Sequence, residues 1–309
     1  MQRAETPRYT HDDCVQNSEK VAWTIAEVLS DEKFDFNRRF MPESLAQVRR
    51  IACLGFEDML VLNQLRGLSY AHLFGFVEEF IVRKIHEMTA SYGPDHPGAR
   101  RALLRFTEEE VKHQVLFDRT KAALLKGLGE CGLISGAGDV AAAVLSKSTL
   151  GVLLLTAMLE WTTQVHYIEA FRSAEEWESL DPTFVRIFKS HWLEEAQHAK
   201  LDELEIKRVA GRVSQAERDR AVDEVLEIGG AFDGLLQAQA ELDLASLERI
   251  TGRTFNPVER EEILTKQDKA YRYTFLVSGL THGRVIEVFA SVCKDAPSRL
   301  AAAAKALSA

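Results

Sequence analysis

Two Glu-x-x-His pairs are the residues of this chain whose types and spacing could do chemistry. One pair is Glu110 and His113, and the other is Glu195 and His198, with His191 four residues before Glu195. On an α-helix, His191, Glu195 and His198 fall within about 60° of one another on a single face. Imidazole and carboxylate together form a ligand set for a first-row transition metal. The spacing therefore predicts a metal site.

The order of the acidic residues makes this prediction more specific than either pair alone. Glu78 precedes Glu110 by 32 residues, and Glu160 precedes Glu195 by 35. At about 1.5 Å of rise per residue, each interval suits one helix, a turn and an antiparallel return to the same level. Two such hairpins bring ligands to one centre, as in di-iron carboxylate bundles. The predicted metal ligands are Glu78, Glu110, His113, Glu160, His191, Glu195 and His198.

The helix faces that carry the carboxylates are largely apolar. Phe74 and Ile81 share a face with Glu78, and Leu103 and Phe106 share one with Glu110. A buried carboxylate is costly unless a metal or another partner compensates its charge. Several of them on apolar faces therefore favour a bound metal.

Two of the ligand assignments have alternatives in the sequence. Glu79 adjoins Glu78, but it lies on a more polar face with Arg83, so Glu78 is preferred. Glu169 could replace Glu160, but nine residues correspond to about half a helical rotation, and Glu169 lies toward the polar end of its segment. Glu160 is therefore preferred.

Other candidate residues are given supporting or structural roles. His191 could orient a ligand carboxylate instead of binding a metal itself. Glu109 and Glu194 are expected to face solvent or to support the ligands from outside. The remaining histidines are expected to be ordinary core or surface residues, although His282 lies on a helix that could close the bundle.

The segments that must position these residues have helical periodicity, and no run of alternating β-branched residues is visible. Asp181-Pro182 and Asn256-Pro257 are helix start signals, and Gly67 is expected to loosen a junction between helices. We expect irregular structure in 1–17, a frayed helix in the C-terminal tail, and helices over about 18–29, 42–65, 68–92, 97–128, 140–172, 182–208, 214–248 and 257–290.

These expectations define an all-α fold: a ferritin-like four-helix bundle with additional flanking helices. We expect one domain over 1–309, with the bundle core at about 65–210 and C-terminal flanking helices over 211–309. The Gly-rich stretch 129–138 is expected to be a connection, because it lacks the pattern of a phosphate-binding loop.

The composition narrows the possible partners and compartment. The 309 residues are 46% hydrophobic and carry a net charge of −9, which argues against nucleic acid or a membrane surface as the main partner. The four cysteines show no C-x-x-C pairing, as expected in a reducing cytoplasm. No apolar signal segment is visible, and the longest apolar run, near Leu150 to Leu159, is too short to span a bilayer.

The order Glu, Glu-x-x-His, Glu, Glu-x-x-His resembles the ferritin-like di-iron superfamily. With His191 added, the pattern His-x-x-x-Glu-x-x-His resembles the p-aminobenzoate N-oxygenase family. That resemblance implies two iron ions, O2 as co-substrate, and oxidation of an amine, often an arylamine, toward hydroxylamine, nitroso or nitro products. It also implies a cytoplasmic homodimer, often in natural-product biosynthesis. Electrons are expected from an external redox partner, because no flavin or nicotinamide motif is visible.

Other functions remain open on the sequence alone. A di-iron oxygenase could instead hydroxylate C–H bonds, and manganese could replace iron. A ferroxidase or metal-storage protein is disfavoured by the length of the chain. A helical scaffold protein without metal is the remaining alternative.

Overall fold

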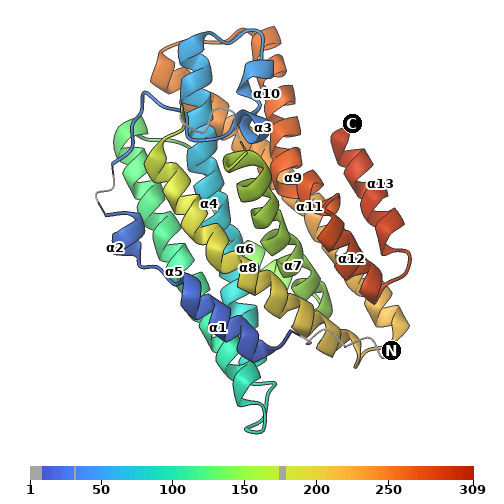
Figure 1. Ribbon diagram of the computed structural model, residues 1–309. Coiled ribbons are helices and arrows are strands. Elements are labelled where there is room, and N and C mark those ends of the chain that lie inside the picture. Colours follow the sequence, from blue (N-terminus) through green and yellow to red (C-terminus); the bar gives the residue numbers. More distant parts are fainter. Residues whose placement is uncertain (1–8, 31–32, 174–178) are drawn as a thin grey trace, which may run out of the picture.

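The computed structural model describes residues 9–30, 33–173 and 179–309, and Figure 1 shows these residues as an all-α bundle. Four long helices form its centre: α4 (Phe56–Thr89), α5 (Pro97–Leu128), α7 (Thr149–Val165) and α8 (Pro182–Ala210). Helix α4 packs along α5, α7 packs along α8, and the two pairs contact each other. The predicted all-α fold class is confirmed.

Further helices surround this centre. Helix α9 contacts α4 and α7, while α1 contacts α5 and α8. The remaining contacts join α10, α12 and α13 into a layer beside α7 and α9, toward the red end of the chain in Figure 1. The bounds of the surrounding elements are α1 (His11–Val21), α2 (Ile25–Val28), α3 (Glu43–Ala46), η1 (Val48–Arg50), α6 (Ala137–Leu145), α9 (Gln215–Thr251), α10 (Pro257–Arg272), α11 (Ser278–Leu280), α12 (Gly283–Val292) and α13 (Ala296–Ser308).

The start signals read from the sequence act as expected. The Asp181 carboxylate accepts a hydrogen bond from the Phe184 amide at 2.7 Å, and Pro182 occupies the first turn of α8. Asn256 caps α10 in the same way, since its side chain accepts from the amides of Val258 and Glu259. These caps satisfy amides that have no partner within the helix.

The predicted helix over 42–65 and the junction at Gly67 are wrong. After Pro42 the chain forms only the single turn of α3, which ends at Gln47 with a left-handed φ of 50°. Helix α4 then runs unbroken through Gly67. A Cβ at this glycine would lie 2.7 Å from Cβ of Phe40. Gly67 therefore permits close packing inside a helix and does not interrupt it.

Both ends of the described chain are more regular than predicted. Thr10 and Asp13 form a reciprocal capping box that starts α1 within the segment expected to be irregular. At the other end, α13 is held by burial: Leu300 is fully buried and Ala304 is 4% exposed. Weak local propensity is outweighed here by packing against neighbouring helices.

The segments 140–172 and 257–290 are interrupted, although each was predicted as one helix. Ser148 caps α7 through the Gly151 amide and so separates α7 from α6. Helix α7 continues as a π-helix, η2 (His166–Phe171), and α10 continues as a second π-helix, η4 (Tyr273–Val277). Single π-helical turns are rare and often occur at functional sites.

The hydrophobic core has two parts that lie at different levels of the bundle. One contains Phe74 of α4 and Phe117 of α5, and the other contains Ile81 of α4 and Phe106 of α5. Glu78 and the pair of Glu110 and His113 lie between these positions along their helices. A polar layer therefore crosses the bundle between two apolar clusters.

Among the described residues, no single helix is long and apolar enough to cross a membrane, whereas the bent pair Pro257–Leu280 and Gly283–Val292 passes that test by length and composition.

Candidate metal centre

The seven predicted ligands meet in the polar layer of the bundle. Glu78 comes from α4, Glu110 and His113 from α5, and Glu160 from α7, while α8 supplies His191, Glu195 and His198. Every one of these side chains is at most 3% exposed. Six of them form two groups whose ligand atoms lie within 4.8 Å of one another.

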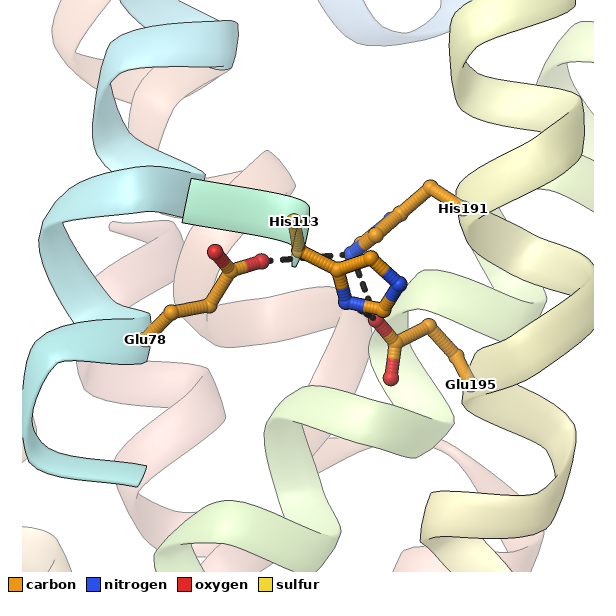
Figure 2. Close-up of side chains that lie close together, drawn as sticks. All are labelled: Glu78, His113, His191 and Glu195. Carbon is orange, nitrogen blue, oxygen red and sulfur yellow. Dashed lines mark ion pairs between the residues drawn. The ribbon is translucent and has the colours of Figure 1, made fainter. Parts of the chain in front are cut away.

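The first group consists of Glu78, His113, His191 and Glu195, and Figure 2 shows these side chains converging from α4, α5 and α8. Nε2 of His191 lies 3.3 Å from Oε1 of Glu78 and 2.5 Å from Oε1 of Glu195. Nδ1 of His113 lies 3.1 Å from the same Glu195 oxygen. The group offers two imidazoles and two carboxylates to one position.

The second group consists of Glu110, His113, Glu195 and His198. Nδ1 of His198 lies 2.8 Å from Oε1 of Glu110 and 2.7 Å from Oε2 of Glu195. The two groups share His113 and Glu195, and each oxygen of Glu195 faces a different group. This is the position of a carboxylate that bridges two metal ions.

Glu160 lies beside the two groups and contacts Glu195. Burial raises the pKa of Glu160 well above its usual value, and the neighbouring carboxylates Glu195 and Glu110 raise it further. Burial also raises the pKa of Glu78 to about 8, against the effect of His191. The layer thus gathers more negative charge than its imidazoles balance without protons or metal.

The atoms that point into the centre are buried without a hydrogen-bond partner. They include both carboxylate oxygens of Glu78 and Glu110, Nδ1 of His113, and both ring nitrogens of His191. Buried polar atoms normally have partners, so a cluster of such exceptions needs an explanation. A pair of divalent cations would satisfy these atoms and offset the carboxylate charge. The residues therefore fit a two-metal centre.

Two further carboxylates support the imidazoles from outside the centre. Nε2 of His198 donates to Glu109 at 3.0 Å, and Nε2 of His113 donates to Glu194 at 2.9 Å. Each of these carboxylates directly precedes the ligand carboxylate of the other pair. Both are at most 3% exposed, so the expectation of a supporting role holds and the solvent-facing alternative is wrong. Fixing Nε2–H leaves Nδ1 free to bind a metal.

The supporting carboxylates have charged and polar partners that sequence analysis did not identify. Ser18 of α1 donates to Glu109, and Nε of Arg105 lies 3.2 Å from its carboxylate. Burial opposes ionisation of Glu109, but His198, Ser18 and Arg105 lower its pKa. Lys112 lies 2.5 Å from Glu194. Adjacent acids before each Glu-x-x-His pair were the only sequence signal for these supports.

Trp23 completes this outer support on the side of His113. Its ring stacks on the His113 imidazole with centroids 5.9 Å apart, and Lys112 lies 4.0 Å above the indole. Trp23 lies between α1 and α2, far from His113 in sequence, so periodicity could not connect the two residues.

His191 has different surroundings from the other two imidazoles. No carboxylate outside the centre accepts from its Nδ1. The rings of Phe117, Phe74 and Phe188 surround it instead, with centroids 5.0, 5.2 and 6.5 Å away. Packing, not a hydrogen bond, fixes the orientation of this imidazole.

The alternative residues lie outside the centre. Glu79 pairs with Arg83 at the surface, and Glu169 is exposed. His282 begins α12 and packs near Trp161, with ring centroids 5.8 Å apart. The structure thus places Glu78 and Glu160 in the polar layer, in the positions preferred from the sequence.

Comparisons with known proteins give similarity in structure only. No family model matches the sequence, and no curated protein matches it. One similar solved structure is an R2-like ligand-binding oxidase with aerobically reconstituted Mn/Fe cofactor, with a TM-score of 0.47 and 14% identity, covering 88% of this chain and 93% of that chain. Two point mutants of such an oxidase, also with Mn/Fe cofactor, give TM-scores of 0.46 and 0.48 at 16% and 14% identity, each over 88% of this chain and 95% and 94% of theirs.

Proposed function

We propose that this chain is a non-haem di-iron oxygenase that uses O2 to oxidise the nitrogen of an amine. Its metal ligands would be Glu78, Glu110, His113, Glu160, His191, Glu195 and His198. Bound iron would supply the redox chemistry that activates O2, and electrons would come from an external donor. The substrate would be a small amine, possible products being a hydroxylamine, a nitroso or a nitro compound. The working form would be a cytoplasmic homodimer.

The observation that carries this proposal is the third imidazole in a double cluster of ligand atoms. A six-residue set would supply two histidines, whereas here His191 lies in contact distance of both Glu78 and Glu195. A more nitrogen-rich ligand set alters the electronics and coordination number of a bound metal. This is the feature on which the resemblance to N-oxygenases rests.

The protein side chains have separable tasks in this proposal. Glu195 would bridge the two ions through its two oxygens, and Glu109 and Glu194 hold the imidazoles of His198 and His113 in one tautomer. Phe74 and Phe117 form an apolar wall beside His191 and limit the access of water.

A reconstitution experiment tests the function. The purified protein is loaded with Fe(II) or Mn(II) without O2, its metal content is measured, and O2 is added with an electron donor and a panel of amines. We expect two metal ions per chain and hydroxylamine, nitroso or nitro products with Fe(II). Less than about one metal ion per chain would defeat the metal centre. Products hydroxylated only at carbon would defeat N-oxygenation and favour C–H hydroxylation.

A further inference from the structure

A small cavity lies on the far side of the aromatic wall from His191. Its volume is about 270 Å³, and its lining includes Gly75 and Phe76 of α4 and Phe117 of α5. Phe117 also packs on the imidazole of His191, with ring centroids 5.0 Å apart. One face of this ring therefore belongs to the cavity and another part to the metal centre. A single side chain separates the two spaces.

The polar residues of the cavity adjoin predicted ligands along the chain. Glu79 follows Glu78 on α4, and Gln114 follows His113 on α5. The Gln114 amide donates to Oε2 of Glu79 at 3.1 Å across the two helices. The cavity thus lies at the level of the metal centre, on the outer side of the seam between α4 and α5.

The outer end of the cavity reaches solvent. Asp118 and Lys121 line it there, and their side chains are 73% and 29% exposed. These two residues pair with each other at 2.6 Å. Small-molecule sites combine an apolar lining with a few polar groups that fix orientation, and drug-sized ligands need at least about 300 Å³. A slightly smaller cavity suits a small, ring-sized molecule.

We propose that this cavity is the substrate entrance pocket and that it binds an uncharged aromatic primary amine beside the gate formed by Phe117. The inference rests on the proposed function and names the substrate class and its route. The ring of the amine packs against Phe117 and Phe76. Its N–H groups are donated to Glu79, whose carboxylate oxygens have lone pairs beyond those used by Arg83 and Gln114.

The charge of the lining favours the uncharged form of the amine. Glu79 is already paired with Arg83, and Asp118 with Lys121, so no carboxylate of the pocket is left to neutralise an ammonium group. Aromatic amines are weak bases and are uncharged at neutral pH, whereas simple aliphatic amines carry a proton. An uncharged amine also keeps the nitrogen lone pair that accepts an oxygen atom.

Gly75 allows the pocket to be filled without removing any packed side chain. A Cβ at this position would lie 3.4 Å from Cβ of Phe117, so a larger side chain extends into the cavity. Gly75→Leu also replaces glycine within a helix by a better helix former. Gly230→Leu on α9 is the matched control, since nothing lies within 4 Å of its added Cβ.

The test measures equilibrium binding of p-toluidine to the full-length protein, both as purified and loaded with Fe(II) in the absence of O2. We expect binding to the wild type, at least tenfold weaker binding to Gly75→Leu, and unchanged binding to Gly230→Leu. Glu79→Ala should weaken p-toluidine several-fold but leave N,N-dimethyl-p-toluidine, which has no N–H group, unaffected. Thermal melts establish that each variant is folded.

The outcomes separate the pocket from the function. Equal binding to the wild type and Gly75→Leu, or no binding to the wild type, overturns the pocket. Hydroxylamine formation with the same kcat/KM in Gly75→Leu also overturns it, while the proposed function stands. Conversely, binding that depends on Gly75 without any nitrogen oxidation supports the pocket and defeats the proposed function.

Discussion

Glu109 accepts a hydrogen bond from Nε2 of His198 at 3.0 Å, although the two residues belong to different Glu-x-x-His segments. Glu194 holds His113 in the mirrored way at 2.9 Å. Each hairpin therefore orients a ligand of the other, and the two halves of the centre depend on each other for their geometry.

Glu109→Ala should lower the affinity for Fe(II) by about 10–100-fold, because the His198 imidazole loses the acceptor that fixes its tautomer. Competition with a chromophoric Fe(II) chelator measures the effect. Glu108→Ala is the matched control, since Glu108 is the exposed neighbour on the same helix. Equal affinities of the two variants would show that the hydrogen bond does not support a metal ligand.

His191→Ala should keep the fold but lose one of the two metal ions. His191 belongs only to the group with Glu78, whereas the group with Glu110 and His198 does not contain it. Elemental analysis after Fe(II) loading should give about half the wild-type metal content. Unchanged metal content together with unchanged turnover would exclude His191 as a ligand.

Metal binding should raise the thermal stability of the wild type, and Glu160→Gln should reduce the rise. The buried carboxylates lack a compensating cation in the metal-free protein, and a ligand present at 100 times its Kd stabilises by about 2.7 kcal/mol. Glutamine keeps the size of Glu160 but binds metal poorly. Calorimetric scans with and without Fe(II) measure both proteins, and an equal rise in Tm would exclude Glu160.

His166 should give the metal-free protein a stability term that disappears in acid. Tyr70 donates to its Nδ1 at 2.7 Å, so the ring is held neutral with the proton on Nε2, which lies 3.2 Å from Oγ of Ser278. Burial lowers its pKa from 6.5 to about 4. Because the unfolded chain binds the proton first, this stability is present above pH 6.5 and is lost as pH falls toward 4.

The lost stability amounts to roughly 3 kcal/mol at 1.36 kcal/mol per pKa unit. Urea unfolding between those pH values compares the wild type with His166→Asn, and the variant should show a correspondingly smaller loss. His96→Asn serves as the control at an exposed histidine. Parallel pH curves for the wild type and His166→Asn would contradict the prediction.

Gly67→Ala should destabilise the protein by about 1–3 kcal/mol, although alanine is the better helix former. The added Cβ would lie 2.7 Å from Phe40 and 3.2 Å from Phe184. Gly234→Ala on α9 should instead stabilise by roughly 0.5–1 kcal/mol, because nothing lies within 4 Å of that position. Urea unfolding measures both, and equal effects would contradict the packing role of Gly67.

The sequence by itself determined the helical fold class and the residues of the polar layer. Ligand spacing is a local property: one helical face carries His191, Glu195 and His198 wherever the helix lies. The intervals from Glu78 to Glu110 and from Glu160 to Glu195 fixed the level at which two hairpins meet. Start signals such as Asp181-Pro182 are likewise local, since capping involves only the next few amides.

Only the tertiary structure decided the features that depend on contacts between distant segments. Gly67 was misread because its meaning depends on Phe40, which approaches from another part of the chain. The exchange of support between Glu109 and His198 required two helices to be placed side by side. The aromatic wall at His191 and the cavity behind Phe117 arise in the same way, because packing, unlike helical periodicity, is not encoded in neighbouring residues.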